Sequence, residues 1–218
     1  MIKVKDPFSG LSHLVGALLS IVGLVLLIYN AVKYGGVSHI VSFSIFGTSL
    51  ILLYAASSLY HLLPLSQKGR SVLRRIDHMM IYVLIAGTYT PVCLIALKGA
   101  WGYSLLVGVW ALAIVGILLK IFWMGAPRWF STLLYVLMGW LIAIAFWPIL
   151  QTVPTAGVVW MVMGGVFYTI GAVFYGFKWP PNIIPGWFGF HEIFHVFVMA
   201  GSFSHFWLMQ RYITFIKF

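Results

Sequence analysis

The chain has 218 residues, of which 62% are hydrophobic and only 7% are charged, and its mean hydropathy is +1.04. A soluble domain of this length could not hide so much apolar surface, so the composition indicates an integral membrane protein. The net charge of +10 would suggest a nucleic-acid partner in a soluble protein, but here the basic residues cluster in short connections, as topology signals do. We therefore expect contact with the lipid bilayer and none with nucleic acid. Cys93 is the only cysteine, which excludes an intrachain disulfide and a cysteine-based zinc site.

Seven apolar segments follow one another along the chain, and each is about as long as a helix that spans a bilayer. They lie near residues 10–33, 38–63, 72–97, 101–123, 129–148, 156–177 and 188–213. The breaks between them are short and often contain glycine or proline, as in Tyr34-Gly35-Gly36 and the stretch from Lys178 to Gly186. The segments are too long for the strands of an outer-membrane barrel. The sequence therefore predicts an all-α fold, in which residues 1–218 form a single domain of seven transmembrane helices.

Lysine and arginine are distributed unequally between the two sides of this predicted bundle. One side has nine basic residues, namely Lys3, Lys5, Lys68, Arg70, Arg74, Arg75, Lys120, Arg128 and Lys178, and the other has four, namely Lys33, Lys98, Arg211 and Lys217. Because cytoplasmic connections are enriched in positive charge, we expect a cytoplasmic N-terminus and an external C-terminus. This orientation is opposite to that of the G-protein-coupled receptors, so seven helices alone do not indicate that family.

The last apolar segment contains the sequence His191-Glu192-Ile193-Phe194-His195. On a helix, His191 and His195 lie one turn apart on one face, so both imidazoles can bind a single metal ion. The chain has only three acidic residues, Asp6, Asp77 and Glu192. Asp77 and Glu192 fall in or beside apolar segments, where an ionisable side chain is costly and indicates a functional site.

Four ionisable residues on three predicted helices have a similar depth in the membrane. His61 lies near the end of the second segment, Asp77 near the start of the third, and His191 and His195 near the start of the seventh. At a rise of about 1.5 Å per residue, all four lie within about 5 to 15 Å of the face assigned to the cytoplasm. Zinc takes three or four nitrogen, oxygen or sulfur ligands, and a catalytic zinc site keeps one position for water. We therefore predict a zinc site formed by His61, Asp77, His191 and His195.

Several separated motifs resemble one family of membrane proteins. Ser57-Ser58-Leu59-Tyr60-His61, Asp77 on the next segment, and His191 to His195 on the last one are similar to the haemolysin III proteins, as is Ser12-His13-Leu14-Val15-Gly16. These proteins are the bacterial branch of the progestin and adipoQ receptor family. The resemblance extends over essentially the whole chain.

This resemblance implies a seven-helix bundle in the bacterial plasma membrane, with the N-terminus inside and zinc near the cytoplasmic face. It implies that His61, His191 and His195 hold the zinc. It also implies that Asp77 holds a zinc-bound water and that Ser57 contributes a nearby hydroxyl group. Some members have a neutral residue at the position of Glu192, so we do not assign Glu192 as an obligatory base. Relatives are linked to lipid amide hydrolysis of the ceramidase kind, whereas the haemolysin name records a pore-forming or lytic activity.

The histidines also have a simpler interpretation. A single histidine in a membrane helix is more often a hydrogen-bond partner between helices than a metal ligand, and we apply this interpretation to His13, His39, His78 and His205. His39 falls in an outer connection, where we expect it to be solvated. His205 lies about 21 Å along the helix axis from His191, so it cannot bind the same ion but could line a cavity. The alternative for the predicted histidine ligands is a buried hydrogen-bonded cluster without metal.

Asp77 and Ser57 have alternatives of the same kind. Asp77 could instead pair with Arg74 or Arg75, or favour the positive end of its own helix. Ser57 shares a helix face with His61, but a serine in a membrane helix often bonds back to its own backbone.

Three classes of function are compatible with these residues. In the first, the protein is a hydrolase of a lipid amide or ester, in which zinc activates water and Asp77 accepts a proton. In the second, it is a receptor or sensor with a structural zinc that ties three helices together. In the third, it is a lytic or pore-forming protein, although no segment has a continuous polar stripe. A soluble-type zinc protease is disfavoured, because no glutamate follows the His191–His195 motif as a third ligand.

Overall fold

The computed structural model describes residues 6–184 and 187–217, and the regular elements in this part of the chain are helices. They are α1 (Pro7–Tyr34), α2 (Val37–Leu62), α3 (Gln67–Pro91), α4 (Gly99–Phe122), α5 (Arg128–Trp140), α6 (Phe146–Thr152), α7 (Thr155–Phe177) and α8 (Phe190–Arg211). A π-helical turn, η1 (Val92–Leu97), extends α3. The short 3-10 helices η2 (Leu141–Ala145) and η3 (Ile213–Phe215) follow α5 and α8.

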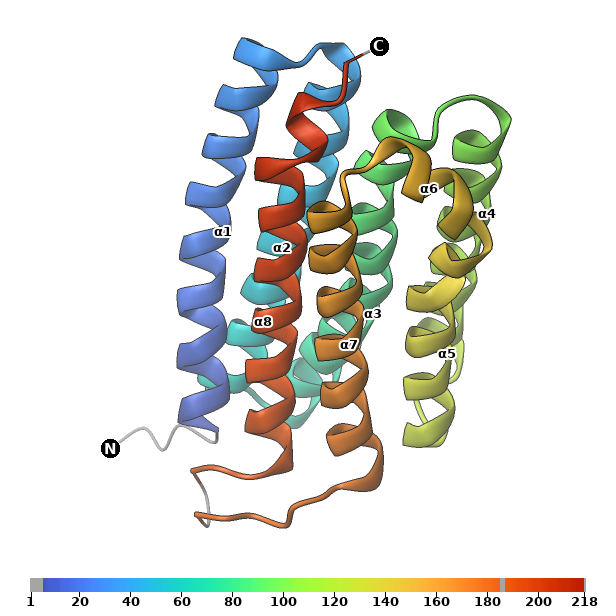
Figure 1. The fold of residues 1–218 in the computed structure, drawn as a ribbon. Helices are drawn as coiled ribbons and strands as arrows, with labels where there is room; N and C mark the ends of the chain where they lie inside the picture. Colours follow the sequence, from blue (N-terminus) through green and yellow to red (C-terminus); the bar gives the residue numbers. More distant parts are fainter. Residues whose placement is uncertain (1–5, 185–186, 218) are drawn as a thin grey trace.

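Six units of the described chain are long and apolar enough to cross a membrane: α1, α2, α3 with η1, α4, α5 through α6, and α7. The seventh unit, α8, has 22 residues and is less apolar, because it carries the two histidines of the 191–195 motif and several further polar residues. Figure 1 shows α8 running the length of the bundle, with the N- and C-termini at opposite ends. The predicted all-α bundle of seven membrane helices is confirmed. Which end faces the cytoplasm stays a prediction.

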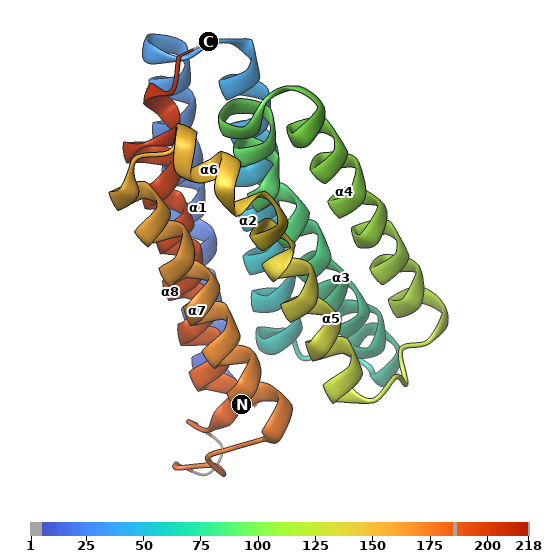
Figure 2. The same cartoon turned by 45° about the vertical axis from the view of Figure 1, so that its right-hand side comes forward.

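The helices form two groups that α2 connects. Figure 2 shows α1, α7 and α8 on one side and α3, α4 and α5 on the other. The most extensive contacts join α1 to α2, α7 to α8, and α2 to α3, whereas α5 packs more sparsely against α3, α4 and α7. The outer faces of α1 and α4 expose large apolar side chains such as Leu19, Val25 and Val107, as expected for surfaces in contact with lipid. A cavity lies between the two groups, as described below.

Two helices near the site begin at residues that differ by a few positions from the approximate bounds of the predicted segments. Helix α3 begins at Gln67 rather than near 72, because the hydroxyl of Ser66 accepts a hydrogen bond from the Gly69 N–H (3.3 Å) and caps the helix. The basic residues from Lys68 onward therefore lie on the first turns of α3 and not in the connection. Helix α8 begins at Phe190 rather than near 188. Lys3, Lys5, Pro185 and Gly186, which entered the sequence argument, lie outside the described residues.

The prediction for His39 was also wrong. The connection after α1 consists of only Gly35 and Gly36, so His39 already belongs to the first turn of α2. Its side chain is buried, with its ring 5.9 Å from that of Phe43. A two-glycine connection is too short to hold this histidine in solvent.

Two helices change their winding beside the cavity. Pro91 has no N–H to donate to the preceding turn, and α3 continues after it as the π-helical η1. The α5 unit is interrupted by η2, where the Tyr89 hydroxyl accepts from the Ile142 N–H (2.8 Å) and donates to the Gly139 carbonyl (2.7 Å). Tyr89 therefore satisfies backbone groups that a continuous α-helix would pair internally.

Candidate metal centre

Three histidines from two helices meet at the end of the bundle that carries the N-terminus. His61 lies in the last turn of α2, and His191 and His195 lie in the first two turns of α8. Each offers one ring nitrogen, and these three nitrogens lie within 4.8 Å of one another. The Nε2 atoms of His61 and His191 are 3.3 Å apart. This arrangement could hold a metal ion, because three converging imidazole nitrogens suit zinc and other transition metals.

The triad is shielded from solvent. His61 and His195 are buried, and His191 is half-buried beside the ring of Tyr175, at 5.8 Å between ring centroids. The Nδ1 atom of His195 is buried without a hydrogen bond of ordinary geometry. The Ser9 backbone of α1 lies near this ring, and the three converging nitrogens of the triad could hold a metal ion.

Two residues that the sequence argument did not place at the site support the triad. Asp6 precedes α1, and its Oδ2 lies 3.2 Å from Nδ1 of His61. His13 of α1 stacks on His195, with ring centroids 3.7 Å apart and planes inclined by 12°. Neither ring nitrogen of His13 makes a hydrogen bond of ordinary geometry, although the His195 backbone lies near the ring. His13 therefore contacts α8 through ring stacking and through the His195 backbone, so it lies between helices as predicted.

Glu192 stands beside the triad but is fully engaged elsewhere. Its Oε1 accepts a hydrogen bond from the Ser9 hydroxyl (2.8 Å), which joins α8 to α1. Its Oε2 accepts from the Gly189 N–H (2.9 Å) and caps the start of α8. Both carboxylate oxygens thus have structural partners, which gives Glu192 a role that needs no proton transfer.

Asp77 and Ser57 lie close to the triad. Ser57 is buried on α2, one turn before His61, and both residues interact with the Asp77 carboxylate. The Asp77 side chain is 15% exposed, and its Oδ2 is 3.8 Å from Nδ1 of His78. Among the described residues it makes no ion pair with Arg74 or Arg75, the alternative partners considered above. The group close enough to share one ion comprises the three histidines, with Asp77 beside it.

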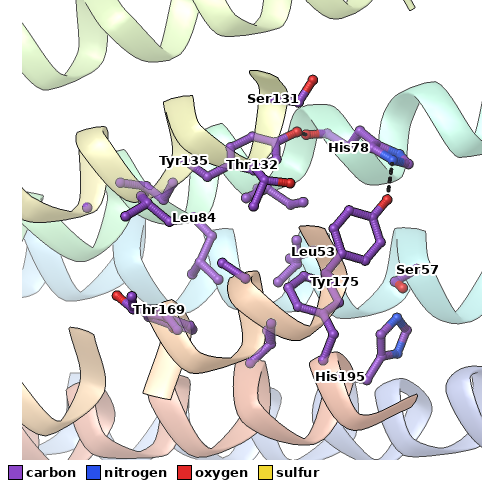
Figure 3. A pocket seen from close by; sticks show the side chains of 18 of the residues that line it. Leu53, Ser57, His78, Leu84, Ser131, Thr132, Tyr135, Thr169, Tyr175 and His195 are labelled. Carbon is purple, nitrogen blue, oxygen red and sulfur yellow. Dashed lines mark hydrogen bonds between the residues drawn. The ribbon is translucent and has the colours of Figure 1, made fainter. Parts of the chain in front are cut away.

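The triad opens into a cavity of about 730 Å³ between the two groups of helices. Figure 3 shows Ser57 and His195 near one end of this cavity and Leu84 and Thr169 toward the other. Apolar side chains from α2, α3, α7 and α8 form much of the wall, namely Leu53, Ile81, Leu84, Ile85, Val92, Met161, Val162 and Val198. The cavity therefore combines the polar side chains of the triad with a wall that is largely apolar.

Comparison with known proteins agrees with the motifs at this site. Residues 1–206 match the family described as haemolysin-III related. The chain belongs to the haemolysin-III-related family. It is 42% identical over 219 residues to the "Hemolysin-3 homolog" of Bacillus subtilis (strain 168), which covers 100% of this chain and 99% of that protein. It is 40% identical to "Hemolysin-3" of Bacillus cereus, over 96% of this chain and 93% of that protein.

A plant protein is similar over a smaller part of its length. "Heptahelical transmembrane protein 1" of Arabidopsis thaliana is 30% identical over 195 residues, or 81% of this chain and 58% of that protein. The resemblance to the haemolysin III proteins is thus confirmed, as is the assignment to the integral membrane proteins.

In this haemolysin-III-related chain, two further histidines lie off the triad as predicted. His78 bonds with the Arg74 carbonyl (2.6 Å) and lies 3.5 Å from the Tyr175 hydroxyl of α7, which makes it a contact between helices. His205 lines the cavity and stacks on Tyr168, with ring centroids 5.6 Å apart. The distance along the helix axis was sufficient to separate His205 from the triad, because both predicted ligands on α8 lie near its start.

Proposed function

We propose that the protein is a zinc-dependent hydrolase that cleaves an amide or ester bond of a membrane lipid. The observation that carries this proposal is a single cavity that brings together the histidine triad, a carboxylate outside the triad and a long apolar wall. A lipid could place its polar bond at the triad and its acyl chain along the apolar side chains. A purely structural metal site would not need such a cavity.

His61, His191 and His195 would hold the zinc, and Asp77, which interacts with His61, would lie beside it. When bound, zinc supplies Lewis-acid chemistry, because it polarises a carbonyl group and makes water acidic enough to lose a proton near neutral pH. Asp77 accepts that proton and later donates it to the leaving amine or alcohol. Ser57 positions the Asp77 carboxylate, and His13 and Asp6 hold the triad's rings.

The proposed orientation indicates the side of the membrane on which the triad lies, and the packing of α5 indicates the route by which a lipid enters the cavity. The charge distribution favours a cytoplasmic N-terminus, which would place the triad near the cytoplasmic side of the membrane. Because α5 packs sparsely against its neighbours, a lipid would reach the cavity from within the bilayer. The protein would then release a fatty acid and a more polar product.

The test is release of fatty acid from a panel of ceramides, other N-acyl lipids and acyl esters by the purified protein in lipid nanodiscs. We expect release from at least one class, loss of release after chelation, and recovery when zinc is returned. The absence of release from every lipid by metal-loaded protein would contradict the proposal.

A zinc-stabilised receptor or sensor is the second candidate. The observation that favours it is that the triad joins α2 to α8, while Asp6 and Ser9 connect the same region to the start of α1. Metal bound only to the folded state stabilises it by about 4 kcal/mol when free metal is a thousandfold above Kd. Both candidates therefore predict a lower thermal midpoint after chelation, and only the hydrolase predicts release of fatty acid.

A further inference from the structure

Three basic side chains from three helices line the cavity beside the triad. They are Arg74 of α3, Lys120 in the last turn of α4 and Arg128 at the start of α5, and we call them the cationic cluster. All three lie close enough to His78 to act on it electrostatically. Positive charge at a helix end near the membrane surface is common, but these side chains also line the cavity.

Lys120 is the most deeply buried member of this cluster. Only 4% of its surface is exposed, and its Nζ donates a hydrogen bond of 2.6 Å to the hydroxyl of Ser131 on α5. An ammonium group has three N–H donors, so a neutral hydroxyl satisfies neither its charge nor all its donors. Figure 3 shows Ser131 and Thr132 on the α5 side of the cavity.

The acidic side chains of the protein are engaged elsewhere. The chain has only three, and the described contacts join Asp6 to His61 and Glu192 to Ser9 and Gly189. Asp77 lies against Ser57, His61 and His78. Among the described residues, no member of the cationic cluster forms an ion pair with a carboxylate. Arg74 is exposed, whereas Lys120 is buried and Arg128 is half-buried. Positive charge at the latter two positions without a counterion is costly, and an anionic ligand in the cavity would offset that cost.

Arg128 links this cluster to the triad. Its guanidinium lies 4.7 Å from the centre of the Tyr175 ring and 5.5 Å from that of Phe190. The Tyr175 ring also lies 5.8 Å from the ring of His191. A single aromatic ring therefore separates Arg128 from a proposed zinc ligand. A guanidinium held by its flat face keeps edge N–H groups that can bind an oxyanion.

We propose that the cationic cluster is an anion-binding subsite that takes the phosphate group of an acyl-chain lipid, while the acyl chain occupies the apolar part of the cavity. The proposed binding of a phosphate lipid does not depend on the hydrolase activity. The conclusion about the substrate does, because it rests on the proposed function. It narrows the substrate to a lipid whose phosphate lies a few bonds from the cleaved amide or ester. Neutral lipids such as ceramides would bind less well.

The experiment measures equilibrium binding of two probes to metal-loaded protein in neutral maltoside micelles at low ionic strength. One probe is the oleyl ether of glycerol phosphate, and the other is the same ether of glycerol without phosphate. Neither contains a carboxylic ester or an amide, so binding is measured without turnover and can succeed even if the hydrolase proposal fails. Inorganic phosphate is tested alone as the free form of the same anion.

We expect the phosphate ether to bind at least about tenfold more tightly than the neutral ether, because hydrogen bonds to charged groups are strong. Lys120→Gln and Arg128→Gln should each remove most of this preference and leave the affinity for the neutral ether unchanged. Lys120→Arg should retain it. Arg128 is only half-buried, and Arg128→Gln leaves the Lys120–Ser131 bond in place. This variant therefore tests the proposal even if Lys120→Gln fails to fold.

The control is Lys33→Gln, which removes one positive charge at the opposite end of the bundle, outside the cavity lining. It should bind both probes as the unmodified protein does. Equal affinity for the two ethers, or an equal loss in Lys33→Gln and Lys120→Gln, would overturn the proposal. Binding of inorganic phosphate as tight as that of the phosphate ether would also overturn it, since the ligand would then not be a lipid.

Discussion

The Oδ2 atom of Asp6 lies 3.2 Å from Nδ1 of His61, which leaves Nε2 of this histidine facing His191. A carboxylate in this position fixes the orientation of a ligating imidazole and increases its basicity. We therefore predict that Asp6→Asn lowers zinc affinity about 10- to 100-fold without abolishing binding. Competition with a fluorescent zinc chelator measures this change.

Glu192→Gln is the matched control. It also removes a carboxylate charge near the three histidine rings, but Glu192 bonds to Ser9 and Gly189 and not to a proposed zinc ligand. Its zinc affinity should stay close to that of the unmodified protein. An equal loss in both variants would attribute the effect to general electrostatics and not to the contact between Asp6 and His61.

Glu192 provides the second prediction. Glu192→Ala removes the bonds to the Ser9 hydroxyl and the Gly189 N–H, and each such bond is worth about 1 kcal/mol. The thermal midpoint should fall, while the zinc content and the hydrolysis rate per folded molecule change little. A loss of turnover by two orders of magnitude at full zinc content would instead make Glu192 the base.

The role of Glu192 shows where sequence reasoning succeeded and where it could not. Helix length, charge distribution and spacing were sufficient to predict the bundle and to bring His61, His191 and His195 together. They could not show that the glutamate of the 191–195 motif joins α8 to α1, because its partner Ser9 is 183 residues away. Contacts between helices that are distant in the sequence depend on how the helices pack, and the pattern of residues along one helix does not predict that packing.

Asp6 and His13 were missed for the same reason. Asp6 precedes the first apolar segment and has no neighbouring motif, and only the packing of α1 against α2 brings it to His61. His13 stands in a stretch similar to the haemolysin III proteins, and that similarity was the available signal. His39 was misplaced because it stands at the predicted start of the second segment and was assigned to the connection, whereas α2 begins at Val37 and includes it.

Asp77→Asn provides the third prediction. The substitution keeps the side chain's shape and removes its basicity, so hydrolysis should slow by about 10²- to 10⁴-fold, as is typical for loss of a general base. The zinc content should remain unchanged, because the three histidines suffice to hold the ion. Ser57→Ala should reduce the rate less, since its hydroxyl acts through Asp77.

The assay reports fatty acid release and bound zinc on the same samples. If Asp77→Asn lost its zinc, Asp77 would be a metal ligand. If the variant hydrolysed lipid at the unmodified rate, Asp77 would have no part in the reaction.

The orientation of the bundle is the fourth prediction. Cysteines placed at Lys68 and Ala100 lie at opposite ends and are exposed, whereas the native Cys93 is buried and should react little. A membrane-impermeant thiol reagent applied to intact cells should label Ala100→Cys and not Lys68→Cys. Ala100 is preferable to its neighbour Gly99, whose positive φ of 58° disfavours a larger residue. The reverse labelling pattern would invert the orientation.

The central claim is that His61, His191 and His195 hold a zinc ion, and metal analysis of the purified protein tests it most directly. The unmodified protein should contain about one zinc per chain, as one three-histidine site requires. The variant with both His191→Ala and His195→Ala should contain almost none. His205→Ala, a buried histidine of the same helix outside the triad, should retain the full content. Equal zinc in the double variant and the unmodified protein, with both shown to be folded by their helical circular dichroism, would contradict the claim.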